Sequence, residues 1–417
     1  MLRYGIAFDI GTTTIVGSLI DLNTLKEIDT ASLQNPQARF GKDILSRISA
    51  VTEDASLLKT LQLDVVGACN SIIHSITNVT DRDYLELVVA AGNSVMEHIL
   101  LGISPVSLAR VPYRPVFKDA RLLPAKDTGL DVKPFTKLYT FPLIGGFIGG
   151  DTVGVILSTG IHKKKEPSLA VDIGTNSEIV IGTGDKLYAA SAAAGPAFEG
   201  GHIKDGMAAD RGAIQGVKIN NDSVILDVIG NINPAGICGT GLVDAAAQML
   251  KAGIMDSSGR IKNRAEVYSN LANKVIEKKD GNAFLLSRDS KREISVTQKD
   301  IRELQLAKGA IQAGIRILMH KAKVDEVEQV YLAGAFGSNL KTESLIQIGV
   351  LKKEWQDKVV FVGDAALDGA KMAACSEKKR KEAEEIAAGV KYLSLSGSRH
   401  FQKEFIRGME FPEAECY

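Results

Sequence analysis

Two short segments of the chain carry an aspartate, a glycine and hydroxyl groups in the same order. The first reads AFDIGTTTIVGSLID and the second AVDIGTNSEIVIG, so that Asp9 and Asp172 each end an apolar run and precede Ile-Gly-Thr. Such a turn can direct backbone N–H groups at a phosphate, while its hydroxyls add donors and its carboxylate holds a hydrated Mg²⁺. One Asp-x-Gly-Thr alone is more often an ordinary β-turn, but its repetition in matching context favours phosphate binding.

The repetition also indicates how a nucleotide would be held. Two lobes that each carry one hairpin can grip the β- and γ-phosphates of one ATP from opposite sides. We expect Asp9 and Asp172 to bind Mg²⁺ through water. The first grip would consist of Asp9, Gly11, Thr12, Thr13 and Thr14, and the second of Asp172, Gly174, Thr175 and Asn176.

A third aspartate, Asp151, follows a glycine run and precedes a helix in GGFIGGDTVGVILSTG. It is either an ordinary N-cap or a carboxylate, water-orienting or linked to magnesium, for in-line attack on the γ-phosphate, and the two roles are compatible. We predict that Asp151 acts in catalysis together with Asp9 and Asp172.

Two other segments are candidates for binding the nucleoside. LAGAFGSNL places Gly334, Ala335, Phe336 and Gly337 where a flat ring could lie against the backbone, although glycine-rich turns of this kind are common. Lys308 precedes this segment on a helix and could face the same pocket, but a solvated surface lysine is the usual alternative. The glycine-rich segments 195–201 and 236–246 are interpreted as structural turns, either of which could approach a ligand.

The elements that must position these residues alternate between strands and helices. The apolar runs around each Gly-Thr turn predict a two-stranded hairpin, and 330–333 predicts a further strand. Thr297 and Asp300 form a capping pattern ahead of a long helix, and 80–101 has helix-compatible apolar spacing. We expect an α/β fold with two lobes, 1–165 and 166–417, with the C-terminal helix returning to the interface between them.

Composition limits the classes of function. The 417 residues are 45% hydrophobic, and 50 Lys and Arg balance 50 Asp and Glu, so no global charge favours nucleic acid or an anionic membrane. Apolar stretches fall short of a membrane span and no signal peptide opens the chain, so we expect a cytoplasmic protein. The four cysteines and six histidines show no metal-ligand spacing, so neither an iron–sulfur cluster nor any metal beyond Mg²⁺ is expected.

The motifs together resemble the superfamily of acetate and sugar kinases, Hsp70 and actin (ASKHA). The two phosphate motifs quoted above are joined by GGDTVG, YLAGAFGSN and GDAALDGAKMA, which are similar to the first connecting, adenosine and second connecting motifs. All five stand in the expected order. The resemblance implies an actin-like ATPase fold, in which each lobe is a mixed β-sheet flanked by helices around a duplicated ribonuclease-H-like core.

Further segments are similar to the ATPase domain of reductive activators of corrinoid proteins. These segments are QNPQARFGKDILSRI, GNSVMEHILLGI, GPAFEGGHIKDGMAA, GICGTGLVDA and FQKEFIRGMEFP. The resemblance implies that ATP helps to return a Co(II) corrinoid protein to the Co(I) state, an uphill electron transfer, and that the protein is a possible homodimer. Family members commonly carry an iron–sulfur domain, so the electron is expected from such a domain or from a separate partner.

Two alternatives remain open at this stage. A small-molecule kinase would use the same cleft, with Asp151 as the base for a substrate hydroxyl rather than for water. A nucleotide-gated binding or chaperone module would use nucleotide state without a small-molecule reaction.

Overall fold

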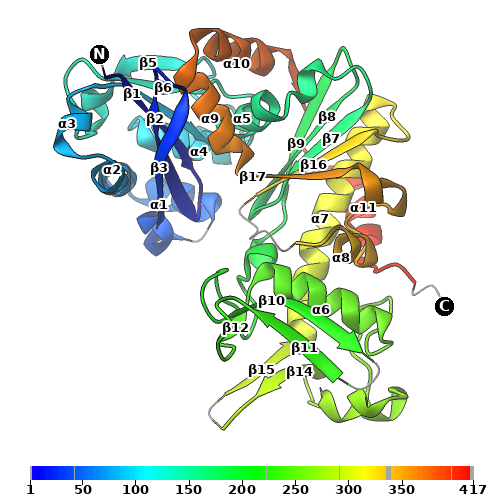
Figure 1. Cartoon of the computed structure of the whole chain (residues 1–417). Coiled ribbons are helices and arrows are strands. Elements are labelled where there is room, and N and C mark those ends of the chain that lie inside the picture. The colour runs from blue at the N-terminus through cyan, green and yellow to red at the C-terminus, as the bar shows by residue number, and fades with distance from the viewer. Residues whose placement is uncertain are drawn as a thin grey trace. The chain divides into compact units, whose positions relative to one another are not determined.

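The computed structural model describes residues 2–41, 43–220, 223–290, 292–334, 340–395 and 397–413 (Figure 1). Its internal contacts divide the chain into two compact units. The first comprises Met1–Glu166, Val180–Ala189 and Asp364–Leu393, and the second comprises Pro167–Ile179, Ala190–Gly363 and Ser394–Tyr417. The predicted lobes and the predicted position of the C-terminal helix between them stay predictions.

The first sheet contains the first Asp-x-Gly-Thr hairpin at its centre. Its order is β3-β2-β1-β4-β6-β5, with β1 antiparallel to β2 and parallel to β4. The strands are β1 (Tyr4–Ile10), β2 (Thr14–Asp21), β3 (Lys26–Gln34), β4 (Leu85–Gly92), β5 (Arg121–Pro124) and β6 (Lys137–Thr140). The expected strand–turn–strand is therefore confirmed for this hairpin, because β1 and β2 pair on both sides of the turn.

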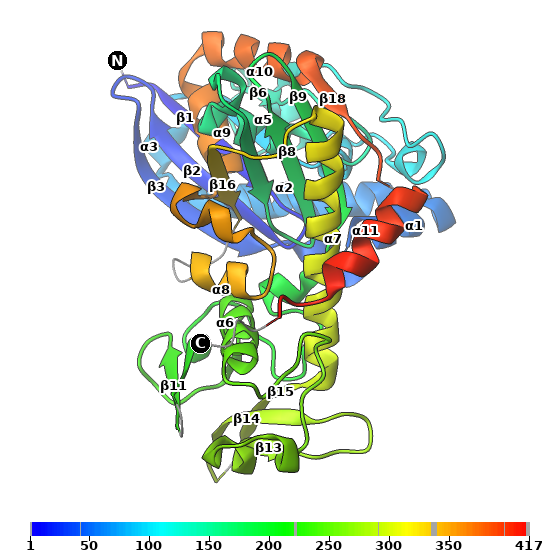
Figure 2. The ribbon, with the colours of Figure 1, turned by 90° about the vertical axis from the view of Figure 1, so that its right-hand side faces the viewer.

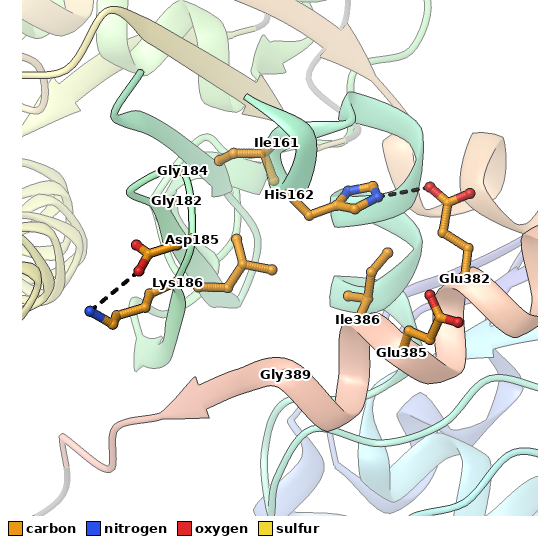
Figure 3. Close-up of a pocket in the computed structure, with 11 residues that line it drawn as sticks. Ile161, His162, Gly182, Gly184, Asp185, Lys186, Glu382, Glu385, Ile386 and Gly389 are labelled. Atoms are coloured by element: carbon orange, nitrogen blue, oxygen red, sulfur yellow. Dashed lines mark hydrogen bonds and ion pairs between the residues drawn. The ribbon is translucent and has the colours of Figure 1, made fainter. Parts of the chain in front are cut away.

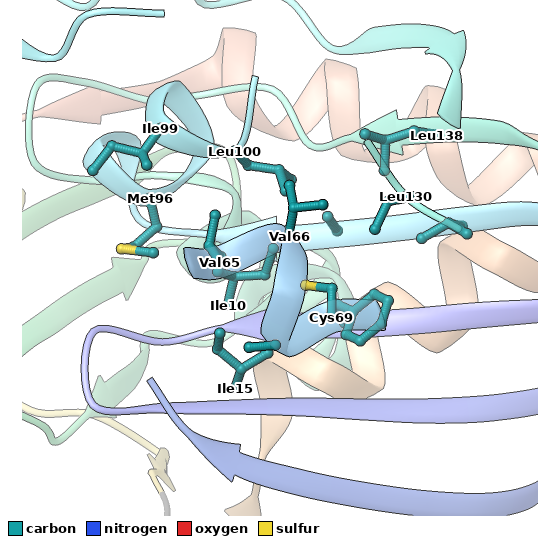
Figure 4. Close-up of a cluster of buried hydrophobic side chains, with 14 of the residues drawn as sticks. Ile10, Ile15, Val65, Val66, Cys69, Met96, Ile99, Leu100, Leu130 and Leu138 are labelled. Carbon is teal, nitrogen blue, oxygen red and sulfur yellow. The ribbon is translucent and has the colours of Figure 1, made fainter. Parts of the chain in front are cut away.

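Helices cover both faces of this sheet (Figure 1). They are α1 (Ile44–Glu53), α2 (Leu57–Ile76), α3 (Val79–Arg82), α4 (Ser94–Leu100), α5 (Gly150–Thr159), α9 (Ala365–Cys375) and α10 (Glu377–Gly389). Ile6, Phe8 and Ile10 alternate along β1 and pack with α1, α2 and α4 in one apolar core (Figure 4). The residues between them, Ala7 and Asp9, therefore lie on the opposite face, which α9 covers.

One sequence expectation in this unit is wrong. The region 80–101 was expected to be helical, yet Leu85–Gly92 forms the strand β4, between the short helix α3, which ends at Arg82, and the helix α4 (Ser94–Leu100). Leu85 and the run from Val88 to Ala91 are buried because β4 lies inside the sheet between β1 and β6. A strand buried on both faces is a continuous apolar run, which periodicity alone does not separate from a buried helix.

Helices α5 and α9, which contain most of the two connecting motifs, pack closely within the first unit. A Cβ added at Gly369 would lie 2.4 Å from the Cα of Gly154, and one at Gly154 would lie 2.8 Å from the carbonyl oxygen of Ala366. Only glycine allows backbones to approach to this distance. The packing of α9 on α5, β1 and β4 is the reason that 364–393 belongs with the first unit.

The second sheet carries the second hairpin. Its order is β17-β16-β7-β8-β9-β18, and β16 is parallel to both β7 and β17. The strands are β7 (Ser168–Asp172), β8 (Asn176–Gly182), β9 (Leu187–Ala193), β16 (Gln329–Ala333), β17 (Val359–Gly363) and β18 (Val390–Tyr392). The predicted strand at 330–333 is thus confirmed as part of β16.

Two helices of the second unit lie side by side. The long helix α7 (Gln298–Ala322) begins at the predicted capping box, in which the side chains of Thr297 and Asp300 each accept the other's backbone N–H. Helix α11 (Arg399–Met409) packs along it (Figure 2).

The remaining strands and α-helices are β10 (Ala213–Asn220), β11 (Ser223–Val228), β12 (Gly236–Ile237), α6 (Gly239–Lys251), β13 (Val275–Ile276), β14 (Ala283–Arg288), β15 (Glu293–Thr297) and α8 (Thr342–Gln347). Over the described residues, no helix combines the length and apolarity needed to cross a membrane.

Candidate nucleotide site

The turn of the first hairpin is braced through its backbone carbonyl groups. The carbonyl oxygen of Gly11 accepts a hydrogen bond from the Asn35 side-chain amide at 2.9 Å, and that of Thr13 accepts one from the Asn35 backbone N–H at 2.8 Å. The carbonyl oxygen of Thr12 accepts one from the Arg47 guanidinium. A Cβ at Gly11 would lie 2.5 Å from the carbonyl oxygen of Thr14, so this turn requires glycine. Three consecutive carbonyl groups are thus anchored, which holds the loop in one conformation.

Arg47 is the central brace. Its side chain is 1% exposed, and its guanidinium also donates to Gln37 Oε1 at 2.8 Å. Burial lowers the pKa of Arg47 to about 10, so it stays charged at neutral pH. Asn93 adds a second support, because its amide donates to Thr12 Oγ1 at 3.1 Å while its Oδ1 caps α4.

Sequence reasoning did not identify Asn35, Arg47 or Asn93 as parts of the site. Their segments served only to support the family resemblance. A signal was present for Arg47, because it falls in register with Ile44, Ile48 and Val51 on the buried face of α1. A charged residue at a core-facing position needs buried partners, which the hairpin supplies.

Asp151 is the second residue of α5, and Gly149 occupies the N-cap position. The N-cap interpretation of Asp151 is therefore wrong, although the carboxylate does lie in the first helical turn. Its Oδ1 accepts the N–H of Thr152 at 2.6 Å. Asp151 as a whole is partly exposed, but its carboxyl group is shielded from solvent. This desolvation raises the pKa of Asp151 to about 6, within the range useful to a general base.

Glu97 of α4 is a second acidic residue beside Asp151 that sequence reasoning missed. Its carboxyl group is fully buried and makes no hydrogen bond of normal geometry to the described residues. A Cβ at Gly150 would lie 2.2 Å from Glu97 Oε1, so the acid packs against the start of α5. Burial raises the pKa of Glu97 well above its ordinary value, and the charge of Asp151 raises it further. The buried surroundings of Glu97 thus favour its protonated form.

The second hairpin has its own supports within the second unit. After Asp172, which ends β7, the N–H of Ile173 donates to the carbonyl oxygen of Ala333 at 3.1 Å. The N–H of Thr175 donates to Glu199 Oε1 at 2.6 Å, and its hydroxyl donates to the same oxygen at 3.0 Å. Asn176 begins β8, so the predicted residues of this grip form one turn and its flanks.

The proposed nucleoside segment is described only in part. Gly334 has φ of 123° and donates its N–H to the carbonyl oxygen of Gly363 at 3.1 Å. Ala335, Phe336 and Gly337 lie outside the described residues. Their role in nucleotide binding stays a prediction.

Lys308 is not the solvated surface lysine considered as the alternative. It is 1% exposed, and its ammonium donates to the carbonyl oxygens of Gly408 and, at 2.7 Å, Glu410. It also lies 5.1 Å from the centre of the Phe411 ring. Burial lowers the pKa of Lys308 to about 7. These contacts tie α7 to the end of α11, and a direct contact of Lys308 with nucleotide stays a prediction.

The predicted residues thus fall into two groups. Asp9, Gly11, Thr12, Thr13, Thr14 and Asp151 belong to the first unit, and Asp172, Gly174, Thr175, Asn176, Lys308 and Gly334 belong to the second. Each hairpin fits a phosphate grip, since each has a constrained turn next to an aspartate at a strand end. Within the described ranges, no three His, Cys, Asp or Glu side chains cluster as direct metal ligands, so water would have to complete a Mg²⁺ shell on Asp9 or Asp172.

A pocket of about 190 Å³ in the first unit contains none of these residues. It is lined by His162 and Glu382, which approach to 2.8 Å, and by the β8–β9 turn (Figure 3). Contacts with His162, Lys163 and Lys379 lower the pKa of Glu382 to about 2, despite burial, which raises it. His162 and Glu382 are thus already paired with each other.

Comparison with known proteins identifies the family. Residues 4–164 match the model of the RACo middle region, and residues 166–417 match that of the C-terminal domain of RACo, the ASKHA domain. The chain is 33% identical over 98% of its length to the corrinoid activation enzyme RamQ of Eubacterium limosum, of which it covers 70%. It is 27% identical over 97% of its length to the [Co(II) methylated amine-specific corrinoid protein] reductase of Methanosarcina barkeri, of which it covers 76%.

Among solved structures, a reductive activator for corrinoid, iron–sulfur protein superposes on 99% of this chain with a TM-score of 0.90 and 35% identity, and the match covers 67% of that structure. The predicted actin-like α/β fold is thereby confirmed. The chain belongs to the RACo family and contains its ASKHA domain.

Proposed function

We propose that this chain binds and hydrolyses ATP in order to drive the return of a corrinoid protein from Co(II) to Co(I). The observation that carries the proposal is the presence of two Asp-x-Gly-Thr hairpins, each constrained by backbone hydrogen bonds, in a chain that is similar over nearly its whole length to corrinoid activators. The kinase and chaperone alternatives have no comparable support, because the relatives that match nearly the whole of this chain are a corrinoid activation enzyme and a reductase of a corrinoid protein.

The predicted phosphate-binding, magnesium-binding and catalytic residues each have a role in this proposal. The turns Gly11–Thr14 and Gly174–Asn176 bind phosphate oxygens, and Asp9 and Asp172 hold Mg²⁺ through water. The metal ion would offset the negative charge of the phosphates. Asp151 orients a water molecule and accepts its proton, for which a pKa of about 6 leaves it ionised at neutral pH.

Electron supply is a separate requirement. Related activators commonly carry an iron–sulfur domain, and the cysteines in the described part of this chain, Cys69, Cys238 and Cys375, are free, with the first two buried. We therefore propose that an iron–sulfur domain or protein delivers the electron while this ATPase acts on the corrinoid protein. Nucleotide state would change the affinity for that protein and with it the accessibility of the cobalt. A homodimer and a cytoplasmic location stay predictions.

The visible spectrum of a corrinoid protein tests the proposal directly. A Co(II) corrinoid protein is mixed with reductant, an iron–sulfur donor, this chain and ATP, and the Co(I) band is followed. We expect Co(I) to form with ATP and not with a non-hydrolysable analogue or without the chain. Absence of ATP-dependent Co(I) with a donor shown to be active would refute the proposal, and ADP release that depends on a sugar would favour a kinase.

A further inference from the structure

A carboxylate of the chain itself contacts the second phosphate hairpin. Glu199 Oε1 accepts hydrogen bonds from both the backbone N–H and the hydroxyl of Thr175, at 2.6 and 3.0 Å. The same oxygen would lie 3.4 Å from a Cβ at Gly174, so it stands over the turn. Thr175 thus gives to Glu199 the two donors that a phosphate oxygen would need.

An anion that shares its donors with a ligand competes with that ligand. Thr175 has one N–H hydrogen and one hydroxyl hydrogen, and both are donated to Glu199, so a phosphate must displace Glu199 to receive them. Hydrogen bonds to a carboxylate are also stronger than those to a neutral oxygen, which makes Glu199 an effective competitor. Two negative groups at the same donors also repel each other. Phosphate binding to this hairpin therefore requires the Glu199 side chain to leave.

Glu199 lies where its displacement would move a neighbouring segment of the backbone. It ends the 3₁₀ helix η5 (Pro196–Glu199), which lies between Gly195 with φ of 77° and Gly200 with φ of 78°. The N–H of Gly195 donates to the carbonyl oxygen of Thr175 at 2.8 Å, which ties the start of η5 to the hairpin as well.

The other side of η5 contacts the first turn of α6. A Cβ at Gly239 would lie 1.6 Å from the carbonyl oxygen of Phe198, so the two backbones are in direct contact. A contact this close does not absorb a shift of η5, because packed atoms have no space to yield. Movement of η5 would therefore move the beginning of α6.

We infer that Glu199 is an intramolecular anion that holds the Thr175 donors until a nucleotide phosphate replaces it, and that its release shifts η5 and the first turn of α6. This inference rests on the proposed ATP binding. Glu199 is then a positioning residue, because phosphate binding at Thr175 changes the positions of two segments outside the hairpin, 195–206 and 236–243.

The test compares Glu199→Gln with the unchanged chain and with the control Glu354→Gln, an exposed glutamate of the second unit. Gln keeps the shape of Glu but removes the charge that competes with phosphate, so we expect Kd for Mg²⁺ and an ATP analogue to fall about tenfold. Glu199→Asp, whose shorter side chain withdraws the carboxylate, should lower Kd as well and serves if the Gln variant does not fold. Calorimetry measures the affinities.

Hydrogen exchange measured by mass spectrometry supplies the second readout. In the unchanged chain, the ATP analogue should alter exchange at 195–206 and 236–243, and Glu199→Gln should show part of this change without nucleotide. An unchanged or higher Kd in both Glu199 variants, or no nucleotide-dependent exchange in these segments, would overturn the inference. Failure of the unchanged chain to bind the analogue would instead refute the proposed function, and the inference with it.

Discussion

Replacing Arg47 with Met should weaken the first unit and its hairpin together. The change removes the buried hydrogen bonds to the carbonyl oxygen of Thr12 and to Gln37 Oε1. Bonds to a charged donor contribute about 1.5–3 kcal/mol each, whereas Met keeps the apolar stem and removes a buried charge. We therefore expect a net loss of about 3 kcal/mol in the free energy of unfolding of this unit.

The Arg47→Met substitution should also weaken the binding of ATP. With Thr12 no longer held by Arg47, binding must also order the turn, and we expect Kd for ATP to rise about tenfold. The control is Arg39→Met, which removes an exposed ion pair to Asp64 and should cost less than about 1 kcal/mol.

The two units can be followed separately in this experiment. Trp355, the single tryptophan of the sequence, belongs to the second unit, so its fluorescence during denaturation reports on that unit. Far-ultraviolet circular dichroism and hydrogen exchange at 9–14 report on the first. Equal denaturation midpoints and equal ATP affinities for Arg47→Met and Arg39→Met would show that Arg47 does not brace the hairpin.

Three other predictions follow from the site and its supports. ATP turnover, measured by phosphate release from pH 5 to 8, should rise with pH through about 6 as Asp151 loses its proton. Asp151→Asn should lower turnover about 100-fold or more while changing Kd for ATP little. A variant with full turnover would exclude Asp151 as the base. Because the pKa of Glu97 is raised in the folded state, the free energy of unfolding should fall as pH rises above the ordinary value of 4.5. Glu97→Gln should remove that decline in denaturation experiments. The same pH dependence in the variant and in the unchanged chain would contradict the raised pKa of Glu97. Gly369→Ala should destabilise the folded chain by about 1–3 kcal/mol through the contact with Gly154. The helical control Gly67→Ala, whose Cβ meets no atom within 4 Å, should stabilise it by about 0.5–1 kcal/mol. Equal shifts of the melting temperature in the two variants would refute the close packing of α5 on α9.

The strongest sequence predictions concerned local patterns. Alternating apolar residues around Asp9 predicted a hairpin, and the Thr297 and Asp300 pair predicted the start of a long helix. Both succeed because the physical cause, a period of two or a capping exchange, involves residues within a few positions of one another. The family resemblance succeeds for a related reason, since its motifs are contiguous segments.

Predictions that depended on surroundings were less successful. The run from Leu85 to Gly92 fits a buried helix as well as a strand, and only its pairing with β1 and β6 makes it β4. Lys308 has no sequence feature that marks it as buried, because its partners, Gly408 and Glu410, lie on and beyond another helix. Asp151 was placed correctly at a helix start, but the N-cap belongs to Gly149.

The sequence by itself determined the two hairpins, the alternation of strands and helices, the family and the positions of Asp9, Asp151 and Asp172. Only the tertiary structure decided which groups hold these hairpins: Asn35 and Arg47 for the first and Glu199 for the second. A strand or turn follows from short-range backbone preferences, whereas a buried hydrogen bond forms between residues that only packing brings together. The supports of the site, and the carboxylate that contacts Thr175, therefore became visible only in three dimensions.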